Sequence, residues 1–491
     1  MGEGIKREIP LYRKMLYGVG DVYGGGAFLI IGALFMFFLI DVAGFTPFEA
    51  GVIIAVGKVW DALTDPAMGY ISDHTKSRFG RRRIYFLVGF VPVILSFALL
   101  WTSIAFENDV LKFTYYLFTY MLFSTVFTMV MVPYNSMPAE MTTDYQDRSS
   151  LIGIRMAFSQ FAALLGALLP MTIVRLFTDQ KVGFAVMGLS FGLLYGMAVL
   201  VVFFGTTERP VKNLEHRPVG LFKTLADLMK IMWSTFKNKS LRIHITMYLS
   251  AYVAMDLFNA LMIYYLRDYL HKETFYQILL GVVLLFQLMS LYFVARSCSK
   301  VGNAKTYRRH TTIWLTGIVL FGFIGPSSGT WLIVILGAIT GIGLAGGVMV
   351  PYNMLAFVID ADEMITGKRR EGTYSGMMTF VRKLAQALAL FSVGVYLDLI
   401  GYNAAGIISD TTVLGIRLFF AIAPTILIAG GIISSYRFKI TPKNHKIMMA
   451  EIERLKSGGQ KLDVSETTLN VVQSITGITY DHLWSQDQAE G

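Results

Sequence analysis

Long apolar runs alternate with short polar segments along most of this chain. The runs are continuous, whereas a half-buried strand would alternate apolar and polar residues. A helix needs about 20 mostly apolar residues to cross a bilayer, and only helices and closed barrels satisfy every backbone polar group there. An all-α membrane protein is therefore predicted. Its twelve expected spans lie near residues 17–40, 47–71, 84–105, 112–138, 150–176, 183–205, 241–266, 275–297, 311–329, 331–358, 373–399 and 412–437.

Basic residues are concentrated in every second loop between the expected spans. Cytoplasmic loops carry an excess of Lys and Arg, which orients the chain in the membrane. We therefore expect a multi-pass protein of the cell (inner) membrane with both termini in the cytoplasm. The basic loops are 76–83, 206–242, 296–309 and 367–370, and the opposite set includes 41–47 and 325–330.

The composition agrees with this interpretation and argues against several classes of protein. Hydrophobic residues make up 54% of the chain and charged residues 15%, against about 25% charged residues in soluble domains. The net charge of +10 is explained by the basic loops, so no nucleic-acid partner is expected. The single cysteine, Cys298, excludes an internal disulfide and a multi-cysteine metal site. No phosphate-binding or zinc-protease motif is present, so neither an enzyme nor a cofactor is expected.

The hexapeptide VMVPYN occurs twice, at residues 130–135 and 348–353. Its copies lie in the fourth and tenth expected spans, which are equivalent positions in a duplicated chain of two six-helix halves. Internal repeats of this kind are common in secondary transporters. We predict pseudo-symmetric bundles at 1–205 and 241–437, a cytoplasmic linker at 206–240 with an amphipathic helix around 221–236, and a cytoplasmic tail at 438–491 with a helix near 447–455.

Each copy of the hexapeptide contains a proline, Pro133 or Pro351. Proline removes a backbone donor and kinks a helix, so the pair is a candidate hinge. The alternative is that proline is simply commoner in membrane helices than in soluble ones.

Two carboxylates lie in the second expected span. Asp61 and Asp65 are four residues apart and so share one helix face. Each costs about 2.5–3.5 kcal/mol at the membrane centre on insertion scales. Together they are predicted to hold a sodium ion or to share a proton, with Thr64 as a neighbouring candidate ligand. The alternative is a buried ion pair that holds helices together.

Other charged residues are expected inside the membrane. Arg382 and Lys383 lie in the middle of span 11, and one of them is expected to pair with a span 2 carboxylate. Adjacent helix positions point about 100° apart, so both cannot face the same partner. Asp256, deep in span 7, is expected to face a cavity. Asp21 and Arg155 lie near span ends, where snorkelling or pairing with a loop is the alternative.

Three stretches carry a family resemblance. Residues 60–86 (WDALTDPAMGYISDHTKSRFGRRRIYF), 132–155 and 360–383 resemble the glycoside–pentoside–hexuronide:cation symporters, the melibiose-permease group of the major facilitator superfamily. The resemblance covers both predicted bundles in order, up to about residue 457. It implies a symporter of a sugar or glycoside, driven by sodium or a proton.

The resemblance also implies roles for individual residues. Asp61 and Asp65 match the family's cation site, together with Thr128 in span 4. Lys383 matches a span 11 lysine that couples the two substrates, and Arg155 matches a span 5 arginine. The acids that hold sugar in melibiose-type members are not found in the matching region of span 1, residues 23–28, or in span 4, where Met131 and then Asn135 stand.

The missing acids and the retained basic residues favour an anionic glycoside, such as a glucuronide or sulfosugar, over a galactoside. The candidate substrate-binding residues are Asp21, Tyr134, Asn135, Arg155, Asp256, Tyr352, Asn353, Thr379 and Arg382. Alternatives are a lysolipid or other amphiphile symporter on the same fold, as in eukaryotic relatives of the family, and a transporter-like sensor. We expect the partners to be a small-molecule sugar, a monovalent cation and the bilayer, and the protein to be a monomer.

Overall fold

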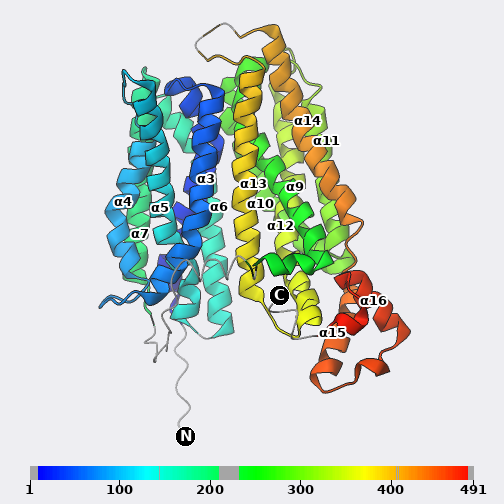
Figure 1. Ribbon diagram of the computed structural model, residues 1–491. Helices are drawn as coiled ribbons and strands as arrows, with labels where there is room; N and C mark the ends of the chain where they lie inside the picture. Colours follow the sequence, from blue (N-terminus) through cyan, green and yellow to red (C-terminus); the bar gives the residue numbers. More distant parts are fainter. Residues whose placement is uncertain are drawn as a thin grey trace. The chain divides into compact units, whose positions relative to one another are not determined.

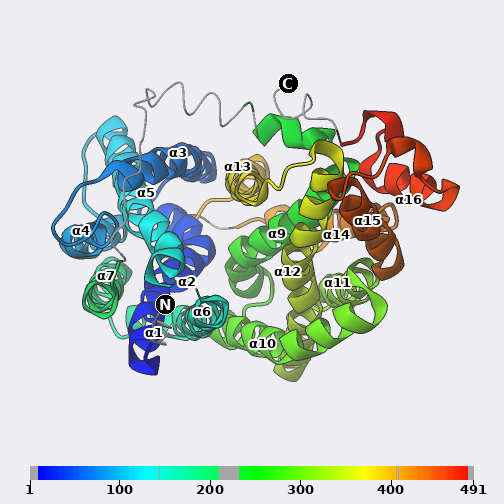
Figure 2. The same ribbon diagram turned by 90° about the horizontal axis from the view of Figure 1, so that it is seen from below.

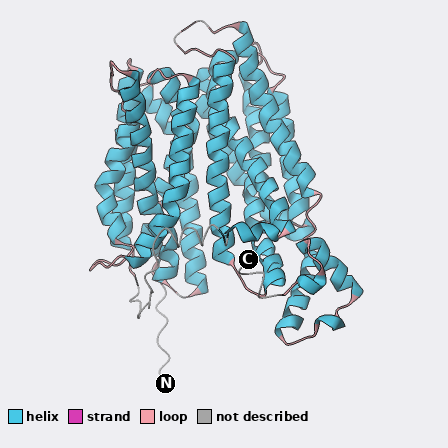
Figure 3. Cartoon of the chain, in the orientation of Figure 1, coloured by secondary structure: helices cyan, strands magenta, loops and turns pink. Residues whose placement is uncertain are grey.

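A computed structural model describes residues 9–142, 144–208, 230, 232–404, 406 and 408–484. Within these ranges all regular secondary structure is helical (Figure 3). The predicted linker helix falls mostly on residues 209–229 and 231, outside the described residues.

Twelve helical segments among the described residues correspond to the twelve expected spans. The first is broken into α1 (Leu11–Gly18), α2 (Asp21–Ile30) and π-helical turns at Ile31–Phe35 and Phe38–Val42. The others are α3 (Pro47–His74), α4 (Ile84–Leu100), α5 (Asp109–Met141), α6 (Tyr145–Val174), α7 (Gln180–Gly205), α9 (Lys239–Tyr264), α10 (Tyr276–Val301), α11 (Asn303–Phe321), α12 (Thr330–Thr366), α13 (Glu371–Leu399) and α14 (Asp410–Ser435).

Nine of these segments, counted over the described residues, are long and apolar enough to cross a membrane by composition alone. The other three have physical reasons to fall short. α3 carries Lys58, Asp61 and Asp65, α11 begins in a basic stretch, and α4 is apolar but short. The helices α5 and α12 extend beyond the expected spans 4 and 10 because polar residues continue the helix past the apolar run.

The chain forms two compact units. The first unit comprises Met1–Leu221 with Leu390–Thr412, and the second comprises Phe222–Ala389 with Val413–Gly491. The predicted boundaries at 205 and 241 stay predictions.

In the first unit, α4 packs against α7 and α5, α2 against α6, and α3 against α5 (Figures 1 and 2). Glycine permits some of these close approaches. A Cβ on Gly192 of α7 would lie 2.8 Å from the carbonyl oxygen of Ile94 on α4.

In the second unit, α12 packs against α11, α10 and α9 (Figure 2). A Cβ on Gly343 of α12 would lie 2.2 Å from the backbone nitrogen of Trp314 on α11, so a larger residue there would separate the helices. The tail adds α15 (Pro442–Lys456) and α16 (Glu466–Thr476), which pack against α12. The helix predicted near 447–455 is confirmed by α15.

Candidate cation and substrate sites

The two span 2 carboxylates meet one hydroxyl group. A capping box at Thr46 and Glu49 starts α3, which then carries Asp61 and Asp65 on one face. On α5, the Oγ1 atom of Thr128 lies 2.8 Å from Oδ1 of Asp65 and 3.1 Å from Oδ1 of Asp61. One hydroxyl proton serves one acceptor at a time. The arrangement therefore brings two acidic oxygens together in the interior of the first unit, where a cation or proton is favoured between them.

A buried lysine that the sequence analysis did not single out lies next to this pair. Lys58 precedes Asp61 by three residues and is only 3% exposed. Its Nζ lies 4.3 Å from the centroid of the Phe28 ring, which fits a cation–π contact. Its position one turn before Asp61 in an apolar run was the signal available in the sequence. Thr64 donates its hydroxyl proton to the backbone oxygen of Asp61 at 3.2 Å, so its role as a cation ligand stays a prediction.

The first unit also holds a cluster of two tyrosines, an aspartate and an arginine. Tyr17 and Tyr134 stack with ring centroids 4.8 Å apart, and the Tyr134 hydroxyl donates to the Tyr17 backbone oxygen at 2.9 Å. Arg155 donates through Nε to Oδ1 of Asp21 at 3.2 Å, and its guanidinium lies 5.1 Å from the Tyr134 ring centroid. Asp21 and Arg155 therefore pair with each other, which excludes the alternative that both reach out to a loop or to the membrane surface. These four residues are named the first cluster.

The second unit holds the same four residue types. Nη2 of Arg382 (α13) donates a hydrogen bond to Oδ1 of Asp256 (α9) at 2.9 Å, and Nη1 lies 2.7 Å from Oδ2 as an ion pair. Its guanidinium lies 4.8 Å from the Tyr252 ring centroid, and Tyr252 meets Tyr352 of α12 edge to face at 6.1 Å. Gln386 adds a hydrogen bond to Asp256 at 3.1 Å. Tyr252, Asp256, Tyr352 and Arg382 are named the second cluster.

The two clusters are equivalent by position in the chain, which explains the repeated hexapeptide. The tyrosine and aspartate, four residues apart, come from spans 1 and 7; the second tyrosine, from VMVPYN, comes from spans 4 and 10; the arginine comes from spans 5 and 11. Each offset is six spans. The repeat therefore supplies one aromatic wall of the same polar cluster in each half. The Tyr-x-x-x-Asp spacing at 17–21 and 252–256 was the signal that sequence analysis missed.

The remaining predicted residues lie near the clusters in sequence but show fewer contacts. Asn135 and Thr379 are exposed, and Asn353 is half-buried. Thr379 donates to the Ser375 backbone oxygen at 3.1 Å. Pro133 and Pro351 lie inside α5 and α12, both of which continue past the proline. The hinge stays a prediction.

One prediction concerns residues that belong to different units. Lys383 lies in the second unit, whereas Asp61 and Asp65 lie in the first, so the pairing of Lys383 with a span 2 carboxylate stays a prediction.

The acids that melibiose-type members carry in spans 1 and 4 are absent here, and an apolar contact stands in their place in the first unit. A Cβ on Gly24 would lie 2.5 Å from Cε of Met131, so an apolar contact fills this place beside Asp21.

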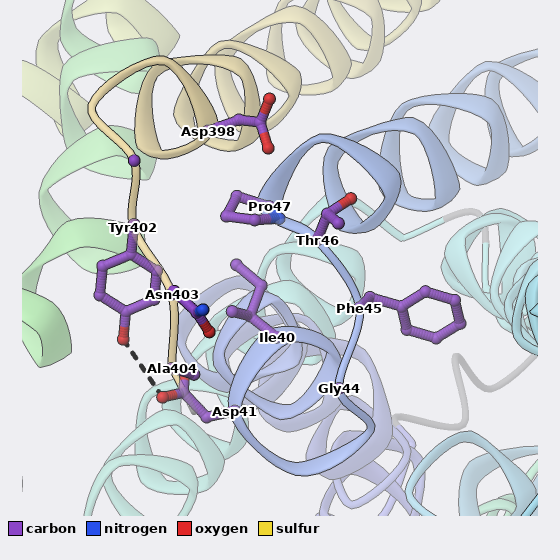
Figure 4. Close-up of a pocket in the computed structure, with 11 residues that line it drawn as sticks. Ile40, Asp41, Gly44, Phe45, Thr46, Pro47, Asp398, Tyr402, Asn403 and Ala404 are labelled. Carbon is purple, nitrogen blue, oxygen red and sulfur yellow. Dashed lines mark hydrogen bonds between the residues drawn. The ribbon is translucent and has the colours of Figure 1, made fainter. Parts of the chain in front are cut away.

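A separate cavity of about 480 Å³ lies in the first unit, among residues 40–47 and 398–404 (Figure 4). The Tyr402 hydroxyl donates to Oδ1 of Asp41 at 3.2 Å, and Asp398 also lines the cavity. None of the residues predicted for the cation or substrate sites lines it. It lies where the loops that are poor in basic residues meet, at the end of the unit predicted to face outward.

Comparisons with known proteins agree with the fold. The family model described as MFS/sugar transport protein matches residues 16–442. The chain belongs to this family. It is therefore a membrane transporter and not an enzyme, and the predicted resemblance to cation-coupled glycoside symporters of the major facilitator superfamily is confirmed.

Two relatives match this transporter over nearly its whole length. The putative sulfoquinovose importer of Escherichia coli (strain K12) is 26% identical over 94% of this chain and 98% of its own. The sodium-dependent lysophosphatidylcholine symporter 1-A of Danio rerio is 24% identical over 94% of this chain and 92% of its own. A solved structure of a mutant of the nucleoside transporter NupG matches with a TM-score of 0.63 at 14% identity, covering 86% of this chain and 99% of that one. That likeness supports the fold alone: twelve membrane helices in two pseudo-symmetric bundles.

Proposed function

We propose that this transporter couples the inward movement of a monovalent cation to the uptake of a sugar or glycoside that carries a negative charge. The observation on which the proposal rests is the pair of carboxylate oxygens of Asp61 and Asp65 on either side of the Thr128 hydroxyl. Two acids held together inside a membrane protein are costly while both are ionised. Binding sodium or a proton removes much of that cost. We place the protein in the cell (inner) membrane, with both termini in the cytoplasm.

The coupling follows from thermodynamic linkage. If the cation changes the free energy of substrate binding, substrate changes that of cation binding by the same amount. Lys58, buried one turn from Asp61, supplies positive charge that balances part of the acidic pair. The coupling role predicted for Lys383 is part of this proposal. The membrane potential contributes about 2.3 kcal/mol per elementary charge per 100 mV to the drive for uphill uptake.

The first cluster is proposed as the anion-recognition part of the substrate site. Arg155 holds Asp21 through Nε only, at 3.2 Å. The two terminal amino groups of its guanidinium remain suited to a carboxylate or sulfonate, which arginine binds in a bidentate manner. The Tyr134 ring beneath the guanidinium keeps it in place. The name of the Escherichia coli relative, a sulfoquinovose importer, supports a sulfosugar-like substrate.

The test is uptake into proteoliposomes with a panel of glycosides, under a sodium gradient and, separately, under a proton gradient. Each acidic glycoside is paired with its neutral counterpart, for example a glucuronide with the matching glucoside. We expect concentrative uptake with one of the two cations, and stronger competition by the acidic member of each pair. Arg155→Lys is expected to weaken binding of the acidic glycoside by about tenfold and binding of the neutral glycoside much less, because lysine cannot form the bidentate contact. Equal competition by both members would overturn the anionic substrate and leave the symporter intact.

A second candidate is an amphiphile such as a lysolipid, because one relative is a lysophosphatidylcholine symporter. Both candidates share the cation pair. Uptake of a fluorescent lysolipid that is competed by no soluble glycoside would favour this alternative over the sugar.

A further inference from the structure

The two helices of the C-terminal tail pack against each other and against α12, and α16 also packs against α9. Thr441 and Ser465 cap the first turns of α15 and α16, and Gly477 ends α16 with a φ of 76° that favours glycine. Met448 and Ile452 of α15 and Ile475 of α16 are buried. The tail is therefore held by packing as well as by charge.

An ion pair inside the tail stiffens it further. Glu451 accepts hydrogen bonds from Arg454 at 2.7 Å and 2.9 Å and another from the Tyr480 hydroxyl. Burial by itself raises the pKa of Glu451, but the bonds from Arg454 and Tyr480 outweigh it, so the pKa lies below its ordinary value. These contacts tie α15 to the segment that follows α16.

The tail is bound to the acidic last turns of α12. The Lys456 ammonium lies 2.6 Å from Oε1 of Glu363, a side chain that is 4% exposed. Nε2 of His445 lies 2.8 Å from Oδ2 of Asp360, and its ring contacts Phe357 of α12. The Trp484 backbone nitrogen donates to the Met364 oxygen at 3.2 Å.

The tail also touches the start of α9. The Ser240 hydroxyl donates to the Ile475 backbone oxygen at 2.7 Å, and Ser240 is buried. The tail therefore spans α12 and α9, two helices that contribute residues to the second cluster.

The first unit satisfies an acid near the end of its span 4 helix in another way. Glu140, in the last turn of α5, pairs with Arg81 at 2.6 Å and Arg82 at 3.0 Å. These arginines belong to the loop between spans 2 and 3, which Glu208 fixes by accepting from the backbone nitrogens of residues 81–83.

The second unit lacks this arrangement among its described residues. The basic residues of the 296–309 loop make no ion pair with Glu363 there, and Arg369 reaches Glu363 only at 3.2 Å while it also bonds to Asp360 and Glu371. The short cationic contact to Glu363 comes from the tail instead.

We propose that Lys456 and His445 are positioning residues for transport: from the tail, they hold the acidic end of α12 as the 76–83 loop holds the end of α5. A rocking bundle transmits movement only as far as it is internally rigid. The tail makes the cytoplasmic end of α12 move with the second unit. This proposal does not depend on which substrate or cation is carried.

The first test measures amide hydrogen exchange of peptides from residues 358–367 in the full-length protein in proteoliposomes. Lys456→Met is expected to raise exchange there about two- to fivefold, the range for one partly exposed ion pair. Lys456→Arg should stay at the wild-type rate because it restores the charge. The matched control is Lys446→Met on the same helix, since Lys446 is exposed and makes no ion pair with a described residue. Wild-type exchange in Lys456→Met, or an equal rise in Lys446→Met, would overturn the proposal.

A second measurement reports on tail docking without any substrate. In a Cys298→Ser background, Ser240→Cys places a thiol under α16, where the tail shields it from a membrane-impermeant maleimide. Lys456→Met should speed its labelling about two- to fivefold, and Lys456→Arg should not. If the thiol at position 240 is labelled as fast in the protein with its intact tail as in a protein that lacks residues 442–491, the tail does not dock.

The transport readout separates positioning from mere stability. With 4-nitrophenyl glucuronide as the probe, Lys456→Met should lower the maximal uptake rate about two- to fivefold at an unchanged half-saturating concentration. Raised exchange with a wild-type uptake rate would show a docked tail that does not serve transport. If no glycoside is taken up by the wild type, the proposed function fails, while exchange and labelling still decide whether the tail positions α12.

Discussion

Each unit carries a cluster of the same four residue types, but the contacts between arginine and aspartate differ between the two clusters. In the second cluster, both terminal nitrogens of Arg382 lie within ion-pair distance of Asp256, one of them donates a hydrogen bond, and Gln386 adds a second hydrogen bond. In the first, Arg155 reaches Asp21 through Nε alone. The tyrosines from the hexapeptide differ in burial: Tyr134 of the first cluster is buried, whereas Tyr352 of the second cluster is 56% exposed.

A further difference lies in the neighbouring spans. Besides its cluster, the first unit has the carboxylate pair of α3. The corresponding helix of the second unit, α10, contains no Asp or Glu. The two units therefore share a polar cluster, while the chemistry around it differs. We infer a division of labour: the first unit holds the cation and the substrate charge, and the second cluster chiefly holds α9 to α13.

The largest expected effect concerns the stability of the second cluster. Arg382→Met leaves Asp256 buried without its ion-pair partner, which costs about 3–5 kcal/mol. Arg155→Met also removes the ion-pair partner of a buried acid, Asp21, but should cost less, because Arg155 makes a single contact to it and is more exposed than Arg382. Thermal unfolding in detergent would compare the two variants. Adding Asp256→Asn to Arg382→Met should recover much of the loss, and equal destabilisation by both arginine variants would contradict the division of labour.

The next effect concerns the carboxylate pair that only the first unit has. Asp61→Asn and Asp65→Asn keep the side-chain shape and remove the charge. Each is expected to lower cation-stimulated accumulation about 100-fold, near the upper range of coupling free energies between two sites. Vesicle uptake at matched expression measures this, with Glu107→Gln outside the site as a control for the loss of one acid. Some downhill movement of substrate should survive. A variant that still accumulates substrate with unchanged cation dependence would show that its aspartate is not the coupling site.

The tyrosines of the repeated hexapeptide should differ in stability. Tyr134→Phe removes a buried hydrogen bond to the Tyr17 backbone oxygen, at a cost of about 1 kcal/mol. Tyr352→Phe should stay within about 0.5 kcal/mol, as expected for an exposed position. The midpoint of thermal unfolding distinguishes them. An equal loss in both variants would mean that the two tyrosines have the same structural role.

The smallest expected effect concerns the prolines one residue before these tyrosines. Pro133→Ala or Pro351→Ala restores a backbone donor and straightens the helix. We expect transport to slow about threefold with near-normal substrate binding, because the change affects the conformational step. Uptake rates and equilibrium binding, measured on the same preparation, separate the two. Wild-type rates in both variants would mark the prolines as ordinary membrane-helix residues.

The sequence alone determined the architecture because each membrane helix must be long enough to cross the bilayer. Apolar runs of similar length therefore recur along the chain. Apolar run length predicted the twelve helices to within a few residues at most ends, and the charged α3 was found despite its polar residues. The ninth span was displaced: α11 (Asn303–Phe321) begins and ends eight residues before the expected 311–329. Asp61 and Asp65 were singled out from the sequence, since a carboxylate in an apolar run is costly enough to stand out. Thr128 was added only because the family resemblance implies it. The structure then placed the Thr128 hydroxyl between the two acids.

The pairing of side chains from distant spans was decided only by the tertiary structure. Arg382 or Lys383 was expected to pair with a span 2 carboxylate, whereas Arg382 pairs with Asp256 of α9. Helix periodicity does not give this pairing, because the rotation of one helix against another depends on packing. The same holds for Tyr17 on Tyr134 and for Lys456 on Glu363, which join residues more than 90 positions apart. Length and hydropathy are properties of a single helix and predict where it begins and ends. A site depends on which faces of different helices meet, and only the packing of the bundle determines those contacts.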